Sequence, residues 1–344
     1  LNTMTNYSWG MTFGIAGDVP PELADRMVLK EALTHCEKPM VFCCKDGNSV
    51  KDVYEMALLL CGGKEDFDQA PTIVQYTEPI SPLVYYDPAV EKVIYCAEQR
   101  IPLINFPAPQ CCGSSPATFA GAIVQANAES LSGLVLHQQV NPGAPFIYGA
   151  FTTIMDLRTT IFSYGAVEIS LMTAALAQMA QHYRLPFFGT AGATDAKTCD
   201  AQAGAEAALQ ILSAATAGSG LVHDCGSWID HGSLASPEFM VLVHDIVDAV
   251  IHYMGGIPVN TETLALDVIH SVGPGGHYLQ DPHTLKHFRS MRYSDIFDRT
   301  IYDQWRAADV ERPTERSSGD AGRAADRIPP TPGPRLVLRR RGEP

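Results

Sequence analysis

The sequence predicts a (β/α)8 TIM barrel, and two observations support this fold class: a repeated strand–helix unit, and polar residues where each strand should end. Between residues 11 and 253, a short apolar run, a polar turn and an amphipathic helix follow one another about seven times. Alternating strands and helices form a parallel sheet with helical crossovers, and a long series of such units curls most simply into a barrel. The seven apolar runs are residues 11–15, 40–44, 72–77, 102–106, 145–151, 185–190 and 220–224.

The first apolar run lies close to the start of the chain, because Leu1 leaves no room for a strand ahead of residue 11. A complete barrel has eight βα units, so we expect the first unit to be missing at the N-terminus. The predicted barrel domain spans residues 1–256. An alternative is that the chain is an inactive truncated remnant whose barrel does not close.

The helices are predicted from apolar periodicity and from their end signals. Apolar side chains recur at helical spacing in residues 50–61, 169–183 and 239–254, which predicts one buried face for each helix. Three helix starts are also predicted where a side chain that can cap a helix is followed by proline, because proline supplies the helical φ angle at the first turn. The three pairs are Asp87-Pro88, Ser115-Pro116 and Ser236-Pro237.

Two segments follow the barrel. Residues 257–310 contain helical stretches at 261–272 and 282–288, separated by a glycine-rich turn, and we expect this helical extension to pack on the barrel. Residues 311–344 contain eight Arg, no Lys, five acidic residues and six Pro, a composition that predicts a disordered tail. Reading out of frame in a GC-rich gene from Thr314 onward would produce the same composition.

Composition excludes several classes of protein. The 344 residues are 46% hydrophobic, enough for one large core, and no apolar run reaches the ~20 residues of a membrane span. A net charge of −14 argues against nucleic acid or an anionic membrane as a partner. Nine cysteines occur without a C-x-x-C pair, which predicts free thiols in a reducing cytoplasm.

Polar residues collect just after the predicted strands. In a barrel these positions surround one mouth, where active sites form. Each residue taken singly has another interpretation, because a polar side chain in a loop often caps the next helix. The residues concerned are Glu78, Asn105, Gln110, Asp156, Arg158, Thr194, Asp195, His223 and Asp224.

Most local catalytic motifs are absent from the sequence, including the nucleophile elbow, H-E-x-x-H and the dinucleotide fingerprint. Lys197 follows a strand and could form a Schiff base, although a solvated or paired lysine is the simpler interpretation. His223, Asp224 and Cys225 contain metal-ligand atoms, which leaves a metal-dependent lyase or hydrolase as an alternative. In a strand, however, His223 and Cys225 would share one face and Asp224 would point the other way.

Aromatic residues also lie at or beside the strand ends. Rings combined with carboxylates hold quaternary ammonium groups, at about 0.5–2 kcal/mol for each good contact. The alternative is that the rings fill the interior of the barrel, and we favour this alternative for Phe187 or Phe188. For Tyr148 and Trp228 both interpretations are kept. The set comprises Tyr76, Phe106, Tyr148, Phe151, Phe188 and Trp228.

Several long motifs, in the right order, resemble the trimethylamine methyltransferase family over about residues 18–305. Family members are longer at the N-terminus, which agrees with the missing first unit, and the similarity stops in the Arg-rich tail. The motifs are Glu78-Pro79-Ile80-Ser81-Pro82-Leu83, Met155-Asp156-Leu157-Arg158, Phe162-Ser163-Tyr164-Gly165-Ala166, Phe187-Phe188-Gly189-Thr190-Ala191-Gly192, Thr194-Asp195-Ala196-Lys197, Leu221-Val222-His223-Asp224, His277-Tyr278-Leu279 and His283-Thr284-Leu285-Lys286-His287-Phe288.

The resemblance implies a barrel that demethylates a methylated amine and passes the methyl group to the cobalt of a corrinoid on a separate partner protein. A Co(I) corrinoid is a strong enough nucleophile for an inert carbon–nitrogen bond, so the enzyme contributes positioning, desolvation and charge placement. Such an enzyme needs no nucleophile and no metal of its own, which agrees with the missing motifs. Barrels of this family often associate, but the periodicity does not indicate how many copies assemble.

One departure from the family pattern narrows the expected substrate. Trimethylamine enzymes of the family carry pyrrolysine in the barrel, near Ala193 here, and this sequence has none. It is therefore more similar to the members without pyrrolysine, which act on quaternary amines such as glycine betaine. A betaine also needs a cationic or hydrogen-bonding group for its carboxylate, and position after a strand makes Arg158 or His223 the candidates. By the same criterion, Asp156 and Glu78 would lie beside the ammonium. The full predicted substrate-binding set is Glu78, Tyr148, Asp156, Arg158, Tyr164, Asp195, His223 and Trp228.

Overall fold

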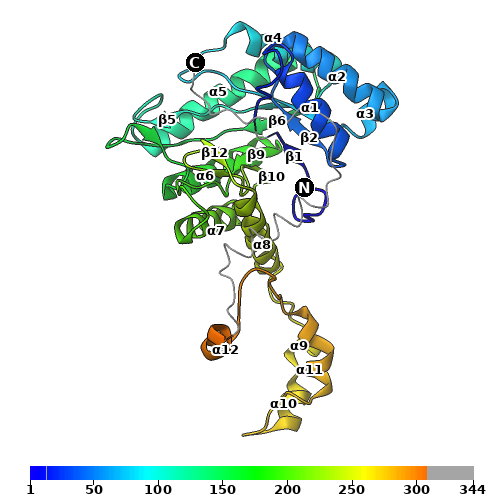
Figure 1. Ribbon diagram of the computed structural model, residues 1–344, viewed down its shortest axis with the longest axis vertical. Coiled ribbons are helices and arrows are strands. Elements are labelled where there is room, and N and C mark those ends of the chain that lie inside the picture. The colour runs from blue at the N-terminus through cyan, green and yellow to red at the C-terminus, as the bar shows by residue number, and fades with distance from the viewer. Residues whose placement is uncertain (13, 308–344) are drawn as a thin grey trace.

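The computed structural model describes residues 1–12 and 14–307, and its centre is a seven-stranded parallel sheet curled into a barrel (Figure 1). The strand order is β1-β2-β3-β4-β6-β9-β10, so each strand lies beside the next one of the predicted series. All seven predicted strands are confirmed, each shorter than its apolar run. Their bounds are β1 (Gly10–Met11), β2 (Met40–Phe42), β3 (Ile73–Thr77), β4 (Leu103–Asn105), β6 (Phe146–Gly149), β9 (Phe187–Thr190) and β10 (Leu221–His223).

The barrel is nearly closed. Among the described residues, β1 and β10 end the strand order and do not pair with each other. Side chains cover this gap, because the Trp9 ring lies 5.4 Å from that of Phe188 across the barrel. The segment before β1 also bonds to the last barrel helix: the Tyr7 hydroxyl donates to the Met240 carbonyl at 2.9 Å.

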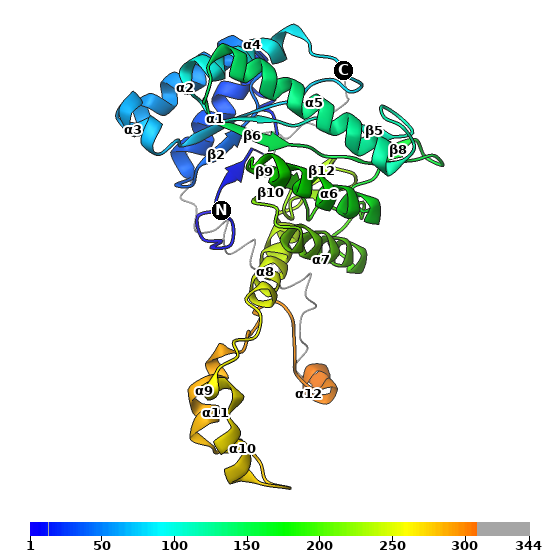
Figure 2. The same cartoon turned by 180° about the vertical axis from the view of Figure 1, so that it is seen from behind.

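Eight helices surround the sheet, and Figure 2 shows them from behind. The helices are α1 (Ala24–His35), α2 (Gly47–Cys61), α3 (Lys64–Gln69), α4 (Asp87–Gln99), α5 (Phe119–Val140), α6 (Val167–Tyr183), α7 (Ala201–Thr216) and α8 (Pro237–Met254). The predicted apolar faces of α2 and α6 pack in the core, and that of α8 does so as far as Val250, whereas Met254 is exposed.

One of the three predicted proline caps is confirmed and two are wrong. Ser236 caps α8, its hydroxyl accepting from the Phe239 N–H at 3.1 Å. Asp87 is the first residue of α4 instead, and no side chain caps that helix. Ser115 forms a bridge with Cys111, so the backbone turns there and α5 begins only after Thr118.

Two small sheets lie beyond the carboxyl ends of the barrel strands and form the rim of the mouth. One combines the loop after β4 with the loop after β6, in the strands β5 (Gln110–Cys111), β7 (Thr153–Asp156) and β8 (Ile161–Phe162). The other is a hairpin after β10, made of β11 (Trp228–Ile229) and β12 (Leu234–Ala235).

The C-terminal helices differ from the expectation that they pack on the barrel. Helices α9 (Thr261–Leu264), α10 (Leu266–Val272) and α11 (Pro282–His287) project away from it as an arm (Figures 1 and 2). None of the three helices buries a residue. A short helix, α12 (Tyr302–Ala307), follows the arm, and the predicted disordered tail lies outside the described residues.

All nine cysteines are described, and none of the nine is joined in a disulfide, as predicted. Across the part of the chain that the structure describes, no helix combines the length and the apolar character needed to cross a membrane.

Candidate functional site

The pair His223–Asp224 lies at the carboxyl end of β10, at the centre of the mouth. Nδ1 of His223 is 2.9 Å from Oδ1 of Asp224, and each side chain is 8% exposed. The two side chains make a close electrostatic contact, and Nε2 has no hydrogen-bond partner among the described residues. A buried imidazole nitrogen without a partner is free to bind a ligand.

The expectation that His223 and Asp224 point to opposite faces is wrong. β10 ends at His223, and Asp224 adopts a left-handed backbone conformation with φ of 61°. This turn brings its carboxylate back toward the imidazole, because the alternation of side chains applies only while the chain is extended. Among residues 1–12 and 14–307, no group of three His, Cys, Asp or Glu side chains is arranged to hold a metal.

Aromatic rings enclose the imidazole. The His223 ring stacks on that of Phe188, with centroids 4.7 Å apart, and meets the edge of Phe106 at 4.8 Å. Phe106 in turn stacks with Phe151 at 6.3 Å, and Phe151 lies 5.5 Å from Tyr164. The rings therefore form a continuous row from the barrel interior to the rim.

Asp224 stays ionised inside this aromatic surrounding. Burial alone would raise its pKa, but the charge of His223 and hydrogen bonds from Thr190 and Tyr164 outweigh burial, and the pKa lies below its ordinary value. Thr190 donates to Oδ2 of Asp224 at 2.9 Å. The hydroxyl groups of Thr190, in β9, and Tyr164, in the rim, thus stabilise the negative charge of Asp224 at the mouth.

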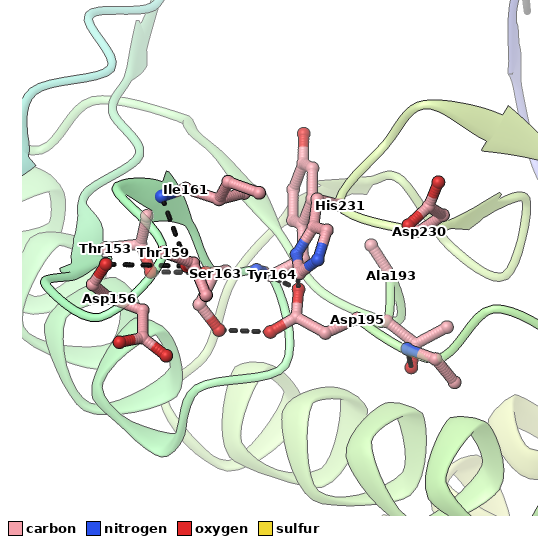
Figure 3. A network of polar contacts seen from close by, with 12 residues as sticks. Thr153, Asp156, Thr159, Ile161, Ser163, Tyr164, Ala193, Asp195, Asp230 and His231 are labelled. Carbon is pink, nitrogen blue, oxygen red and sulfur yellow. Dashed lines mark hydrogen bonds and ion pairs between the residues drawn. The ribbon is translucent and has the colours of Figure 1, made fainter.

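A second carboxylate, Asp195, joins three loops of the rim (Figure 3). Its oxygens accept from the hydroxyl of Ser163, from the N–H of Tyr164 at 2.7 Å, and lie 2.8 Å from Nδ1 of His231. Lys197 contacts the other ring nitrogen of His231 at 3.0 Å. Because Ser163 bonds to the carboxylate and not to the imidazole, this is a positioning network that holds Tyr164, and not a nucleophilic triad.

Helix α7 fixes the loop that carries Asp195. Glu206 accepts from the N–H of Asp195 at 2.9 Å, and Gln210 donates to the carbonyls of Tyr164 and Ala193. Ala193, near which the resemblance places pyrrolysine in related enzymes, is fully buried.

Glu78 reaches the aromatic row from the loop after β3. The Tyr76 hydroxyl donates to its carboxylate, and the Tyr76 ring lies 6.5 Å from that of His223. Burial first, and then the charge of Glu78, raise the pKa of Tyr76 well above its usual value, so the phenol keeps its proton. The Glu78 residue itself is exposed.

Asp156 and Arg158 lie apart from this cluster, on the hairpin between β7 and β8. Arg158 donates to Oδ2 of Asp156 at 2.7 Å, and the arginine side chain is 88% exposed. The Arg158 hydrogen bond lowers the pKa of Asp156 to about 2. The structure therefore brings neither residue into contact with His223.

Tyr148 also lies away from the His223 cluster. Tyr148 is fully buried, and its hydroxyl donates to Oδ1 of Asn127 in α5 at 2.9 Å, so it points toward the helices. Trp228 lies in the rim hairpin, where its carbonyl accepts from the Thr194 N–H at 3.1 Å.

Three residues that the sequence reasoning left out of the predicted set contribute to the mouth: Asp224, Thr190 and His231. Asp224 and Thr190 both lie in motifs that resemble the family, and their positions at strand ends could have identified them as residues of the mouth. His231 lies eight residues beyond β10, and no local pattern distinguishes it, because its role depends on a loop returning to Asp195.

Comparison with known proteins points to one family. The family of trimethylamine methyltransferases (MTTB) matches residues 7–324. A glycine betaine methyltransferase of Desulfitobacterium hafniense (strain Y51) is 30% identical over 328 residues, which cover 95% of this chain and 68% of that protein. The trimethylamine methyltransferase MttB of Desulfitobacterium hafniense (strain DSM 10664 / DCB-2) is 31% identical over 320 residues, covering 93% and 64%.

An archaeal relative is more similar over a shorter stretch. The trimethylamine methyltransferase MttB of Methanosarcina barkeri is 36% identical over 247 residues, which cover 72% of this chain and 50% of that protein. The chain thus spans between about half and two thirds of the length of these relatives.

Proposed function

Because the chain belongs to the trimethylamine methyltransferase family, we propose that it is a methyltransferase that removes a methyl group from a quaternary amine such as glycine betaine. The acceptor is the Co(I) corrinoid of a separate partner protein. The observation that carries the proposal is the ionised Asp224 beside His223, enclosed by aromatic rings at the carboxyl end of the barrel.

The row of rings suits the cationic end of the substrate. A quaternary ammonium has no N–H to donate, so protein sites hold it with aromatic faces and a nearby negative charge. Phe106, Phe151 and Tyr164 offer such faces, and Asp224 supplies the charge, with Glu78 as a second, more exposed carboxylate. Each good cation–π contact contributes about 0.5–2 kcal/mol.

His223 suits the anionic end. Its Nε2 has no hydrogen-bond partner among the described residues and can donate to a substrate carboxylate once the ring carries a proton there. Arg158, the other candidate, projects from the rim with its guanidinium on Asp156, so it would have to leave that partner to bind substrate. The geometry favours His223.

The rim of the mouth fits a protein partner that brings the corrinoid. Exposed apolar side chains follow β3 and flank the β7–β8 turn, and such patches mark protein contacts. They are Ile80, Leu83, Val84, Leu157 and Ile161, which are 44–68% exposed. When bound, the corrinoid supplies the nucleophile, while this chain binds and orients the amine and excludes water.

The loop that carries the first of these side chains is held rigidly. Glu129, buried in α5, accepts from the Ser81 hydroxyl at 2.6 Å and from the Leu83 N–H at 2.9 Å.

We also propose a reducing, cytoplasmic location. Nine cysteines, none of them in a disulfide, support this location.

The test is methyl transfer from a panel of betaines and trimethylamine to Co(I)-cobalamin, followed by the change in its absorption spectrum. We expect turnover with a quaternary amine, little turnover with trimethylamine, and loss of turnover in Asp224→Asn. Tyr148→Phe is the matched control, because this buried tyrosine points away from the mouth. A folded protein that transfers no methyl group from any of these amines, either to cobalamin or to the corrinoid protein of a relative, would contradict the proposal.

A further inference from the structure

The arm, residues 255–291, is held in a definite direction at its base. Arg292, the first residue after the arm, donates to Asp248 at 2.6 Å and contacts Asp245 at 2.7 Å, both on α8. Ser294 donates to Asp245 at 2.9 Å, and Ile296 is buried in the core beside α8. The chain thus leaves α8, forms the arm and returns to the same helix, so both ends of the arm are attached to α8.

The arm has no core of its own. Its helices bury no residue, and ten of its apolar side chains are 38–90% exposed. Single exposed apolar residues are normal on a protein surface, but ten within one 37-residue segment indicate a contact with another molecule. The ten are Ile257, Val259, Leu264, Leu266, Ile269, Tyr278, Leu279, Leu285, Phe288 and Met291.

This apolar surface extends onto its neighbours. The last turn of α8 adds Ile251, Tyr253 and Met254, which are 48–67% exposed. A stable, specific interface buries about 800 Å² on each partner, an area that thirteen large side chains of this exposure can supply.

Charge distinguishes the arm from the rest of the molecule. Residues 1–254 carry 11 Lys and Arg against 26 Asp and Glu, a net charge of −15, whereas the arm carries two against three, a net charge of −1. Two copies of the barrel repel each other when they approach within the Debye length, about 8 Å at physiological salt. The arm is a surface through which two copies can meet without this repulsion.

The arm also points away from the mouth. α8 begins beside the rim hairpin and runs toward the amino ends of the strands: its residues Met240 and His244 already contact Tyr7 and Asn6, just before β1. The arm leaves from the far end of α8 (Figure 1). A molecule bound to the arm would therefore leave the mouth open.

We propose that the arm is a dimerisation element and that its occupant is the arm of a second copy of this chain, related by a two-fold axis. A two-fold contact joins the same patch on both copies, so one apolar surface suffices for both sides. The near-neutral charge of the arm permits this contact, and its length keeps the two acidic barrels apart. Both mouths stay accessible.

Sedimentation equilibrium of the full chain, over a range of protein concentration, tests the proposal. We expect a mass of twice the 37.3 kDa of one chain, or a higher even multiple. In the double variant Leu279→Asp/Leu285→Asp, we expect the dissociation constant to rise by at least about 100-fold, because each substitution places a charge in an apolar interface.

A matched control separates the arm from exposed apolar residues in general. Leu59, on α2, is 85% exposed, and Leu59→Asp should leave the mass unchanged. Far-ultraviolet circular dichroism below the melting transition should give the same spectrum for all three proteins, since none of the substituted side chains is buried in one copy. A wild-type mass of 37.3 kDa at every concentration, or an arm variant that associates as tightly as wild type, would overturn the proposal.

Discussion

The pairs His223–Asp224 and Asp156–Arg158 each place a nitrogen-bearing side chain beside a carboxylate, and both lie at the mouth of the barrel. In the first pair each side chain is 8% exposed, whereas in the second the arginine is 88% exposed. The carboxylate pKa lies below its ordinary value in both, so the pKa direction does not separate them. Burial does, because a charge interaction is strong in a low-dielectric interior and screened at the surface.

Asp224→Asn should have the largest effect. Removing one member of a buried charged pair costs about 3 kcal/mol or more of unfolding free energy. It also removes the negative charge proposed to hold the ammonium, so we expect kcat/KM for methyl transfer to fall at least about 100-fold, since each tenfold loss corresponds to about 1.4 kcal/mol. Denaturant unfolding and initial rates measure the two effects, and a variant equal to wild type in both would remove Asp224 from the site.

Phe188→Leu should have the next largest effect. Leucine fills most of the volume but loses the ring that stacks on His223 at 4.7 Å, so the imidazole is less well oriented. We expect KM for a quaternary amine to rise about tenfold, or about 1.4 kcal/mol, with a smaller change in kcat. Tyr148→Phe is the control, and an equal rise in KM there would mean that the effect is general loosening of the core.

Asp195→Asn should have an intermediate effect, because its side chain is 16% exposed and lies between the two extremes. The substitution weakens the contacts to Ser163 and His231, at about 1 kcal/mol of unfolding free energy. We expect kcat to fall with KM nearly constant, since Tyr164 is positioned less well. An unchanged kcat would show that the network supports the fold alone.

The pH dependence should separate the buried carboxylate from other acidic groups. The folded-state pKa of Asp224 lies below the unfolded value of about 3.9, so its stabilisation is fully present above that pH and is lost as the pH falls through the folded pKa. We expect the difference in melting temperature between wild type and Asp224→Asn to shrink as the pH falls from about 5 to below about 4, where the carboxylate takes up its proton. A difference that grows over that interval would contradict this sign.

Arg158→Gln should have the smallest effect on stability, because the pair is solvent-exposed, and we expect no measurable change in melting temperature. If Arg158 nevertheless binds a substrate carboxylate, KM for glycine betaine should rise while KM for an amine without a carboxylate stays constant. A constant KM for both would leave His223 as the anionic-end residue.

Closure of the barrel was the feature of the fold least accessible to sequence reasoning. Seven strands were predicted and seven are present, because continuous apolar runs between helices specify strands covered on both sides. The incomplete pairing between β1 and β10 is covered by Trp9 and Tyr7, whose roles depend on contacts with Phe188 and Met240 more than 170 residues away. A cooperative thermal transition would argue against the inactive remnant.

Position after a strand predicted on which face of the barrel the polar residues lie, but not which of their side chains come together. Position after a strand correctly placed His223 and Glu78 near one aromatic row. The same rule could not tell that Asp156 and Arg158 turn outward on a hairpin, or that Tyr148 points to α5. Strand ends determine the face, whereas loop conformation determines the direction of each side chain.

By itself, the sequence determined the repeated strand–helix order, the parallel sheet and the family, because apolar periodicity and motifs are local patterns. Tertiary structure alone decided that Asp224 turns back on His223, that His231 joins Asp195, and that the C-terminal helices form an arm. The physical reason is that burial, pairing and pKa depend on which distant segments meet, and a left-handed residue or a loop return changes those neighbours without changing any local pattern.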